Sequence, residues 1–367
     1  MAFSKQDEQF MRRALALARR GLGKTSPNPC VGAVVVKAGK IIGEGWHKRA
    51  GGPHAEVFAL RTVNARGATL YVTMEPCCTF GKTPPCTDAI IAAGVKRVVV
   101  AALDPNPKHN GRGLKILRRV GIRVEHGLLA EEATAMNEAF NKWITTGLPF
   151  VIAKAGMSLD GKIATSTGDA KWITGETARR EGHKLRANVD AIVVGANTAI
   201  QDNPQLTVRH GVSGKQPLRV VVDTRGRTST SAKLFSDTHC QRTVVLTTKL
   251  SSARWRGYLT QRGVDVIAVA QRSGRVDLRA GLKALGKRNV TSVLVEGGGE
   301  LLGSLFDAQL ADKVMFFYAP MILGGRKAIT AVAGEGVLKV KHAVLLEDCQ
   351  WRRLGTGEML LEARVAR

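Results

Sequence analysis

Long apolar runs are missing from this sequence. No stretch approaches the roughly 18 consecutive apolar residues that a membrane-spanning helix needs, and residues 1–5 contain no apolar segment of a signal peptide. These absences argue against a membrane protein and against a secreted one. We therefore expect a cytoplasmic protein with no membrane among its partners. The 367 residues suffice for two domains, each with its own core.

Cysteines are few and irregularly spaced. The six cysteines lie at positions 30, 77, 78, 86, 240 and 349, which is not the spacing of a small disulfide-bonded domain. We interpret them as reduced thiols and metal ligands.

Acidic residues are scarce relative to basic ones. The chain has 30 Asp and Glu against 55 Lys and Arg, which gives a net charge of +25. Such an excess favours anionic partners, namely phosphorylated metabolites, dinucleotides or nucleic acid. Only 5% of the residues are aromatic, and no run of five or more Lys and Arg occurs. An evenly spread charge is more typical of a solvated surface than of a nucleic-acid groove, so we expect no nucleic acid among the partners, and the charge alone does not decide which other anion binds.

The clearest chemical signal lies between residues 51 and 86. His54, Cys77 and Cys86 supply one imidazole and two thiolates, the ligand set of a catalytic zinc ion with an open position for water. Glu56 follows the histidine as His-x-Glu, and a carboxylate there can take a proton from that water and pass it on. This order is typical of zinc-dependent nucleobase deaminases. Eight residues separate the two cysteines here, whereas that motif usually has two.

Other interpretations of these residues stay open at this point. Free cysteines are often simply packed in a core, and Cys78 offers a fourth ligand for a closed structural zinc site. We place Cys77 at the metal because it follows Pro76, and we treat Cys78 as a bystander. Residues two apart point to opposite sides of a continuous helix, so His54 and Glu56 can converge only at a helix end.

The first domain, residues 1–147, has an α/β pattern. We expect helices over 4–20, 86–93, 113–120 and 131–145, and strands through 36, from 41, and over 69–73, 96–103 and 122–125. Asn28 stands between two prolines, where it would serve either as a base-recognising amide or in an Asx-turn. Asp104 and Asn106 follow a buried strand, which is where open α/β sheets bind ligands.

The second domain, residues 148–367, begins after the boundary at Gly147. Strand-like runs at 150–155, 191–194, 219–222, 243–246, 264–269 and 292–295 predict a largely parallel α/β sheet. The last run leads into Glu296-Gly297-Gly298 and a helix through 307. That arrangement suits a phosphate at a helix N-terminus, and a tight structural turn is an equal alternative.

Taken together, these residues resemble the bifunctional riboflavin-biosynthesis deaminase/reductase family over nearly the whole chain. The N-terminal match comprises residues 27–32, 51–56, 75–86 and 104–107. The C-terminal match comprises Lys154 and residues 158–161, 172–174, 202–204, 206–209 and 296–298. The resemblance implies a cytidine-deaminase-like three-layer domain followed by a dihydrofolate-reductase-like α/β domain.

The resemblance also implies two activities. The first domain would carry out zinc-dependent hydrolytic deamination of 2,5-diamino-6-(5-phosphoribosylamino)pyrimidin-4(3H)-one. The second would use NADPH to reduce the ribosyl side chain of 5-amino-6-(5-phosphoribosylamino)uracil to ribityl. Zinc would be held by His54, Cys77 and Cys86, with Glu56 as proton shuttle. The deaminase substrate would contact Asn28, Lys82, Asp104 and Asn106.

In the second domain the resemblance implies two sets of binding residues. The dinucleotide would lie against Gly156, Trp172, Thr198, Asp202, Thr224, Gly298, Gly299, Glu300, Leu301, Leu302, Gly303 and Ser304. The sugar phosphate would lie against Ala170, Arg186, Leu206, Arg209 and Glu296. Lys249, after a strand, is a further candidate for the cofactor's 2′-phosphate. We also expect a homo-oligomer.

The chain departs from the family pattern in two places. Cys78-Thr79 replaces the usual Ser-His after the first zinc cysteine, and Ala170 stands where serine is common. A lost hydroxyl contact is typically worth about 1 kcal/mol, so the second departure would weaken substrate binding without abolishing it.

Two other functions compete with the bifunctional enzyme. One is an RNA-interacting deaminase with a basic C-terminal half, and the other is a structural zinc protein that has no use for Glu56.

Overall fold

The chain folds into two compact units, Met1–Gly147 and Leu148–Arg367, in a computed structural model that describes residues 3–81, 83–355 and 357–366. Gly147 ends the last helix of the first unit with a φ of 71°, a left-handed conformation that glycine adopts without steric cost. No helix in the described residues is long and apolar enough to cross a membrane.

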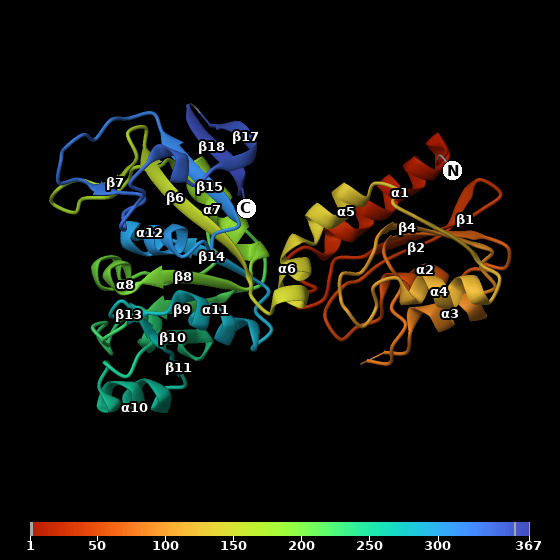
Figure 1. The fold of residues 1–367 in the computed structure, drawn as a ribbon, viewed down its shortest axis with the longest axis horizontal. Helices are drawn as coiled ribbons and strands as arrows, with labels where there is room; N and C mark the ends of the chain where they lie inside the picture. The colour runs from red at the N-terminus through yellow and green to blue at the C-terminus, as the bar shows by residue number, and fades with distance from the viewer. Residues whose placement is uncertain (1–2, 82, 356, 367) are drawn as a thin grey trace. The chain divides into compact units, whose positions relative to one another are not determined.

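The first unit is a three-layer α/β structure. Within the described residues its sheet has the order β2-β1-β3-β4-β5, in which β1 is antiparallel to both neighbours and β3, β4 and β5 are parallel. Figure 1 shows α1 and α5 on one side of the sheet and α2, α3 and α4 on the other. The elements are α1 (Lys5–Ala18), β1 (Gly32–Lys37), β2 (Lys40–Trp46), α2 (Ala55–Leu60), β3 (Thr69–Met74), α3 (Cys86–Ala92), β4 (Arg97–Ala102), α4 (Arg112–Arg119), β5 (Arg123–His126), α5 (Ala130–Met136) and α6 (Glu138–Thr146).

The two faces of this sheet follow the alternation of side chains along its strands. In β1, Ala33 and Val35 pack in the core under α2, α3 and α4, whereas Val34 and Val36 pack in the core under α1. Gly45 in β2 brings α2 close to the sheet, because an added Cβ would lie only 2.3 Å from the carbonyl oxygen of Ala55. That close approach fixes the start of α2.

The helix predicted over 131–145 is wrong as a single element. It breaks at Asn137 into α5 and α6. The Asn137 side chain accepts a hydrogen bond from the Cys30 N–H at 2.8 Å and donates one to the Cys30 carbonyl at 3.0 Å. This buried amide satisfies the backbone of a distant loop, a tertiary contact that helical periodicity does not reveal.

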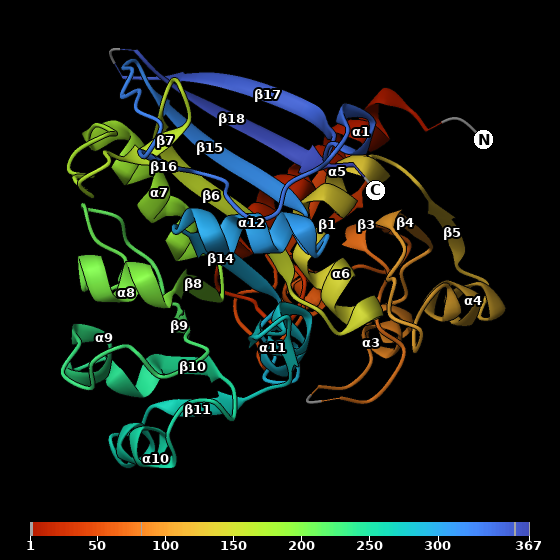
Figure 2. The same cartoon turned by 60° about the vertical axis from the view of Figure 1, so that its left-hand side comes forward.

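The second unit is built on a nine-stranded sheet within the described residues, in the order β11-β10-β9-β8-β14-β6-β15-β18-β17. The strands from β11 to β15 are parallel to their neighbours, while β18 and β17 are antiparallel. Figure 2 shows β17 at one edge of this sheet and β11 at the other. The sheet strands are β6 (Phe150–Ser158), β8 (Ala191–Gly195), β9 (Leu218–Val222), β10 (Thr243–Thr247), β11 (Asp265–Ala268), β14 (Ser292–Glu296), β15 (Lys313–Ala319), β17 (Leu346–Leu354) and β18 (Glu358–Val365).

Helices cover both faces of this sheet. Leucines of α11 and α12 build one core, and residues of α8, α9 and α10 build another on the opposite face. The helices are α7 (Glu176–Asn188), α8 (Ala196–Asp202), α9 (Lys233–Ser236), α10 (Ala253–Gln261), α11 (Leu278–Gly286) and α12 (Gly299–Asp307), and short strands are β7 (Lys162–Ala164), β12 (Gln271–Arg272), β13 (Arg275–Val276) and β16 (Ile329–Thr330).

The parallel strands β6, β8, β9, β10, β11 and β14 agree with the predicted runs to within a few residues. The three strands β15, β17 and β18 were not predicted. Eight of the nine residues of β17 are exposed, so it lacks the apolar pattern that marks a strand in sequence.

Candidate metal centre and the cavity of the second unit

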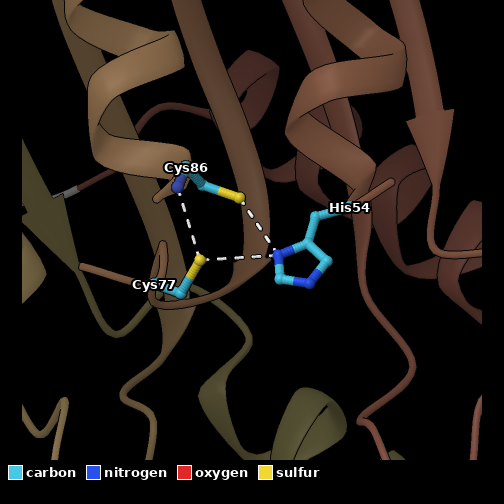
Figure 3. A group of neighbouring side chains, drawn as sticks. All are labelled: His54, Cys77 and Cys86. Carbon is cyan, nitrogen blue, oxygen red and sulfur yellow. Dashed lines mark hydrogen bonds between the residues drawn. The ribbon is translucent and has the colours of Figure 1, made fainter. Parts of the chain in front are cut away.

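Three side chains of the first unit meet at one point (Figure 3). His54 is the N-cap residue of α2, Cys77 lies in the loop after β3, and Cys86 begins α3. The His54 Nδ1 lies 3.2 Å from the Cys86 Sγ and 3.5 Å from the Cys77 Sγ, and all three ligand atoms lie within 4.8 Å of one another. Tetrahedral zinc with Zn–N and Zn–S bonds of about 2.0–2.3 Å needs ligand atoms roughly 3.3–3.8 Å apart. The donor set and spacing therefore fit one zinc ion.

The two cysteines share a negative charge. The side-chain hydrogen bond from Cys86 is the largest effect that lowers the pKa of Cys77, which is brought to about 4. The same bond, together with burial, raises the pKa of Cys86. The Cys86 backbone N–H also points at the Cys77 Sγ at 3.3 Å. Metal ligands must be deprotonated, and the lowered pKa of Cys77 favours that state.

Glu56 lies in the first turn of α2 and is 3% exposed. Burial is the largest cause that raises the pKa of this carboxyl to about 7, and the Cys77 charge adds to it. A pKa near neutrality suits a group that must both accept and donate a proton. His54 has extended backbone angles rather than helical ones, so it and Glu56 can face one place although they are only two residues apart.

Cys78 points elsewhere. Its Sγ lies 3.5 Å from the Nδ1 of His109, and its backbone N–H lies at the same distance from that nitrogen. The adjacent cysteines thus face different partners.

Glu75 organises the loops around the cluster, a role that the sequence analysis did not assign. Its buried carboxylate accepts hydrogen bonds from the backbone N–H groups of Asp104, Gly111 and Gly113, at 3.2, 2.8 and 3.0 Å. Asp104 in turn accepts from the Asn106 N–H at 2.9 Å. The loop after β3 is therefore tied to the loop after β4. The sequence signal for this role of Glu75 is its position directly before the Pro-Cys pair.

The Asn28 side chain is held by His47, a residue that was not among the site residues predicted from the sequence. The His47 Nδ1 lies 3.0 Å from the Pro53 carbonyl, so it must carry the proton, and its Nε2 then accepts from the Asn28 amide at 3.1 Å. Burial lowers the pKa of His47 and keeps the ring neutral. The amide orientation of Asn28 is thereby fixed. Lys82 lies outside the described residues.

A cavity of about 1280 Å³ opens in the second unit, at the carboxyl ends of β8, β9 and β14. Of the residues named from the sequence, it is lined by Gly156, Ala170, Trp172, Thr198, Asp202, Leu206, Arg186, Arg209, Thr224, Glu296, Gly298, Gly299, Glu300, Leu301, Leu302 and Ser304. Gly303 is not part of this lining. It lets α12 pack closely, because an added Cβ would lie 2.0 Å from the Ala333 carbonyl oxygen.

The glycine turn between β14 and α12 exposes a helix N-terminus to the cavity. Gly297 and Gly298 have φ values of 86° and 79°, a region that side-chain-bearing residues rarely adopt. An added Cβ on Gly298 would lie 3.2 Å from the Thr198 Oγ1. The first N–H groups of a helix have no partner within it, so α12 offers donors and a positive dipole end to an anion.

Glu296, at the end of β14, stays ionised in the cavity wall. Burial alone would raise its pKa, but the charges of Arg186 and Lys154 outweigh burial and lower the pKa to about 2. Lys154 lines the same cavity, and burial lowers its pKa in turn. Arginines 225, 227 and 275 line the cavity beside Thr224, whereas Lys249 does not line it. Neither Lys154 nor these arginines were among the predicted site residues.

Comparison with known proteins gives these sites a class and a family. Residues 4–102 match the protein family described as "Cytidine and deoxycytidylate deaminase zinc-binding region". Residues 149–360 match the family described as "RibD C-terminal domain". The molecule is therefore a zinc-dependent deaminase joined to a reductase.

The chain belongs to the RibD family of riboflavin biosynthesis proteins. It is 43% identical to the Actinobacillus pleuropneumoniae member over 93% of this chain and 91% of that protein. The Escherichia coli K12 member is 43% identical over 87% of this chain and 89% of that protein.

Solved structures agree with this assignment. Acinetobacter baumannii RibD has a TM-score of 0.89 at 37% identity and covers 99% of both chains. A Thermotoga maritima diaminohydroxyphosphoribosylaminopyrimidine deaminase/5-amino-6-(5-phosphoribosylamino)uracil reductase has a TM-score of 0.85 at 38% identity, covering 98% of this chain and 99% of that one. The predicted family, fold class and bifunctional activity are confirmed, as are zinc and NADPH as cofactors.

Proposed function

We propose that the first unit deaminates a phosphorylated diaminopyrimidine and that the second reduces the ribosyl side chain of its product, the two activities in the name of the Thermotoga relative. The observation that carries the proposal is the His54, Cys77 and Cys86 cluster with the buried Glu56 beside it. A cluster that closes on a fourth protein ligand would indicate a structural site, and none of the described residues completes it.

In the deaminase site, zinc bound by His54, Cys77 and Cys86 would supply an activated water. Glu56 would accept the two protons of that water in turn, passing one to the ring nitrogen and the other to the amino group, which leaves as ammonia while the water oxygen stays on the ring carbon. Its pKa of about 7 permits both transfers near neutral pH. Asn28, whose amide is fixed by His47, binds the edge of the base. Asp104 and Asn106, held by Glu75, close the other side, with Lys82 as a further contact.

In the reductase site, NADPH supplies the hydride. Thr198, Thr224 and the N-terminus of α12 would hold its phosphates and ribose, and Gly156, Asp202 and Trp172, which line the same cavity, would complete its binding surface. Glu296 accepts hydrogen bonds from sugar hydroxyls and remains charged for this purpose. Ala170, Leu206 and Arg209 line the place for the substrate's ribosyl phosphate.

We assign recognition of the 2′-phosphate of NADPH to the arginines beside Thr224 and withdraw Lys249 from this role. Arg225 is exposed and lines the cavity directly after β9. Arg227 donates to Asn197 at 2.6 Å, and Arg275 pairs with Glu300 at 3.0 Å, so both are already held at the cavity. Guanidinium groups match phosphate geometry better than an ammonium does.

We propose three partners: a phosphorylated pyrimidine, the dinucleotide and a second copy of this chain. We propose that the protein acts in the cytoplasm and does not bind nucleic acid. The cations that line the cavity support small anionic ligands.

The test is a coupled assay that supplies the diamino substrate with NADPH and follows ammonia and absorbance at 340 nm together. Ammonia release without NADPH oxidation would remove the reductase assignment, and NADPH oxidation that starts only from the deaminated compound would remove the deaminase assignment.

A further inference from the structure

An irregular segment, residues 205–209, contributes to the wall of the second unit's cavity without belonging to its sheet. Leu206 and Arg209 of this segment line the cavity. Leu206 has a φ of 51°, a left-handed conformation that a residue with a side chain keeps only where its surroundings hold it. The backbone of the segment therefore needs hydrogen-bond partners outside the ladders of the sheet.

Two side chains of α7 supply such partners. The Arg186 Nη1 donates to the Thr207 carbonyl at 2.9 Å, and the His183 Nδ1 accepts the Arg209 N–H at 2.9 Å. Arg186 and His183 stand three residues apart on the helix, which is the spacing of neighbours on one helical face. The helix thus binds two alternate residues of the segment.

Other side chains hold the rest of the segment. The Gln216 side chain accepts the Val208 N–H at 2.8 Å and donates to the Val208 carbonyl at 3.2 Å. The Arg219 Nη1 donates to the Gln205 carbonyl at 3.1 Å. Each residue of the segment apart from Leu206 therefore has a backbone group bound by a side chain.

His183 can serve only as an acceptor at Nδ1. Because this nitrogen receives an N–H, it carries no proton. The side chain is buried, and burial is the largest effect that lowers the pKa of His183 to about 4, with the charges of Arg186 and His210 adding to it. The ring therefore stays neutral near pH 7. The His210 ring packs beside it, with the two ring centroids 4.7 Å apart.

The Arg209 side chain has donors left for a ligand. It is exposed at the cavity, and its Nη1 donates to the Gln205 Oε1 at 2.8 Å. Among the described residues its Nε and Nη2 have no hydrogen-bond partner. A guanidinium group matches the geometry of a phosphate. The direction of this group depends on the Arg209 backbone, which His183 fixes.

We propose that His183 is a positioning residue of the reductase, which directs the Arg209 guanidinium to the phosphate of the ribosyl substrate by holding the Arg209 backbone N–H. The inference rests on the proposed function of the second unit and adds the side chain that sets phosphate recognition there. Without the imidazole the Arg209 N–H loses its acceptor, and the guanidinium no longer meets the phosphate. Substrate binding weakens, while hydride transfer at the distant sugar carbon is largely unchanged.

The test compares the phosphorylated ribosyl substrate with the same compound lacking the phosphate, in NADPH oxidation by the full chain. His183→Leu should raise KM for the phosphorylated compound about 10-fold or more and change kcat less than about 3-fold. Its kcat/KM for the dephosphorylated compound should hardly change, because that compound makes no phosphate contact. A merely structural role would lower kcat/KM for both compounds alike. His183→Asn places an amide oxygen near the Nδ1 position and should restore the preference for phosphate.

Gln216→Leu separates positioning from direct contact with the substrate. Gln216 lies outside the described lining of the cavity, so it acts on the segment through Val208. This variant should show the same selective loss with the phosphorylated compound. His342→Leu, the same substitution at an exposed histidine outside that lining, is the matched control and should behave as the wild type. Fluorescence titration should give an unchanged Kd for NADPH in every variant.

An unchanged KM in His183→Leu, or an equal loss with both compounds, would overturn the inference. So would a normal phosphate preference in Gln216→Leu, or a failure of His183→Asn to restore it. If His183→Leu lost NADPH binding, Gln216→Leu would decide. A wild type that oxidises NADPH with neither compound would remove the reductase assignment, and with it the inference that rests on it.

Discussion

Arg186 and Glu296 form a bidentate ion pair in the second unit, with Nε–Oε1 at 2.6 Å and Nη2–Oε2 at 2.8 Å. Both side chains are largely buried, at 13% and 11% exposure. Arg186 also donates to the Thr207 carbonyl at 2.9 Å. Arg186 therefore holds the Glu296 carboxylate in place at the cavity wall.

We predict that Arg186→Met lowers the free energy of unfolding at pH 7 by about 3–5 kcal/mol, because the charge of Glu296 stays buried without its partner. The folded-state pKa of Glu296 is about 2, below its ordinary 4.5. Its contribution to stability is therefore present above pH 4.5 and is lost as the pH falls through about 2. Urea unfolding at a series of pH values should show that the difference in unfolding free energy between wild type and variant becomes smaller as the pH falls from 4.5 to about 2.

Arg288→Met is the control for this prediction. Arg288 pairs with Asp265 at the surface, where both side chains are more than 40% exposed. It should cost less than about 1 kcal/mol. A similar loss in both variants, or a gap that does not depend on pH, would argue that Glu296 is not held ionised by Arg186.

The proton role of Glu56 predicts a separation of zinc binding from catalysis. Glu56→Gln keeps the size of the side chain but removes the base, so ammonia release should fall on the order of 10²- to 10⁴-fold. Zinc content by metal analysis should be unchanged. Glu44→Gln, at an exposed ion pair with Arg13, should release ammonia normally. Full activity of Glu56→Gln would remove it from the mechanism.

The different surroundings of the adjacent cysteines predict opposite effects of one substitution. Cys77→Ser removes a sulfur from the cluster, so most bound zinc should be lost, whereas Cys78→Ser faces His109 and should retain about one zinc per chain. Metal analysis after dialysis measures this. The reverse result would move the ligand to Cys78.

The glycine turn before α12 predicts that Gly298→Val abolishes NADPH binding while ammonia release continues. A side chain there would crowd Thr198 and block the approach of a pyrophosphate to the helix N-terminus. Gly324→Val is a fair control, since Gly324 also has a positive φ, 61°, but its Cβ would meet nothing within 4 Å. Titration of NADPH by fluorescence would show the difference. Equal NADPH binding by both variants would make the turn merely structural.

The arginines beside Thr224 predict cofactor preference. Arg225→Ala should weaken binding of NADPH and of 2′,5′-ADP by about 10-fold or more, because a charged hydrogen bond is worth about 1.5–3 kcal/mol. Binding of NADH should hardly change. Lys249→Ala should leave all three dissociation constants as they are. An equal loss of NADPH and NADH binding would contradict recognition of the 2′-phosphate.

The sequence alone determined the chemistry of this protein. One imidazole, two thiols and a carboxylate in this order fit few functions other than binding a catalytic zinc ion. The amino-acid sequence sets the type and number of these ligands directly, because each is a side chain of a particular residue. Continuous apolar runs likewise determined the parallel part of both sheets, since burial on both faces dictates apolar residues along each strand.

Only the tertiary structure decided which neighbour each functional group meets. His47 against Asn28, Glu75 against the loop after β4, and Arg186 against Glu296 join residues 19, 29 and 110 positions apart. Local pattern does not encode such pairs, because they depend on how loops from different strands come together. For the same reason the exposed strand β17 escaped prediction: its place is fixed by pairing with β18, and its own side chains face water.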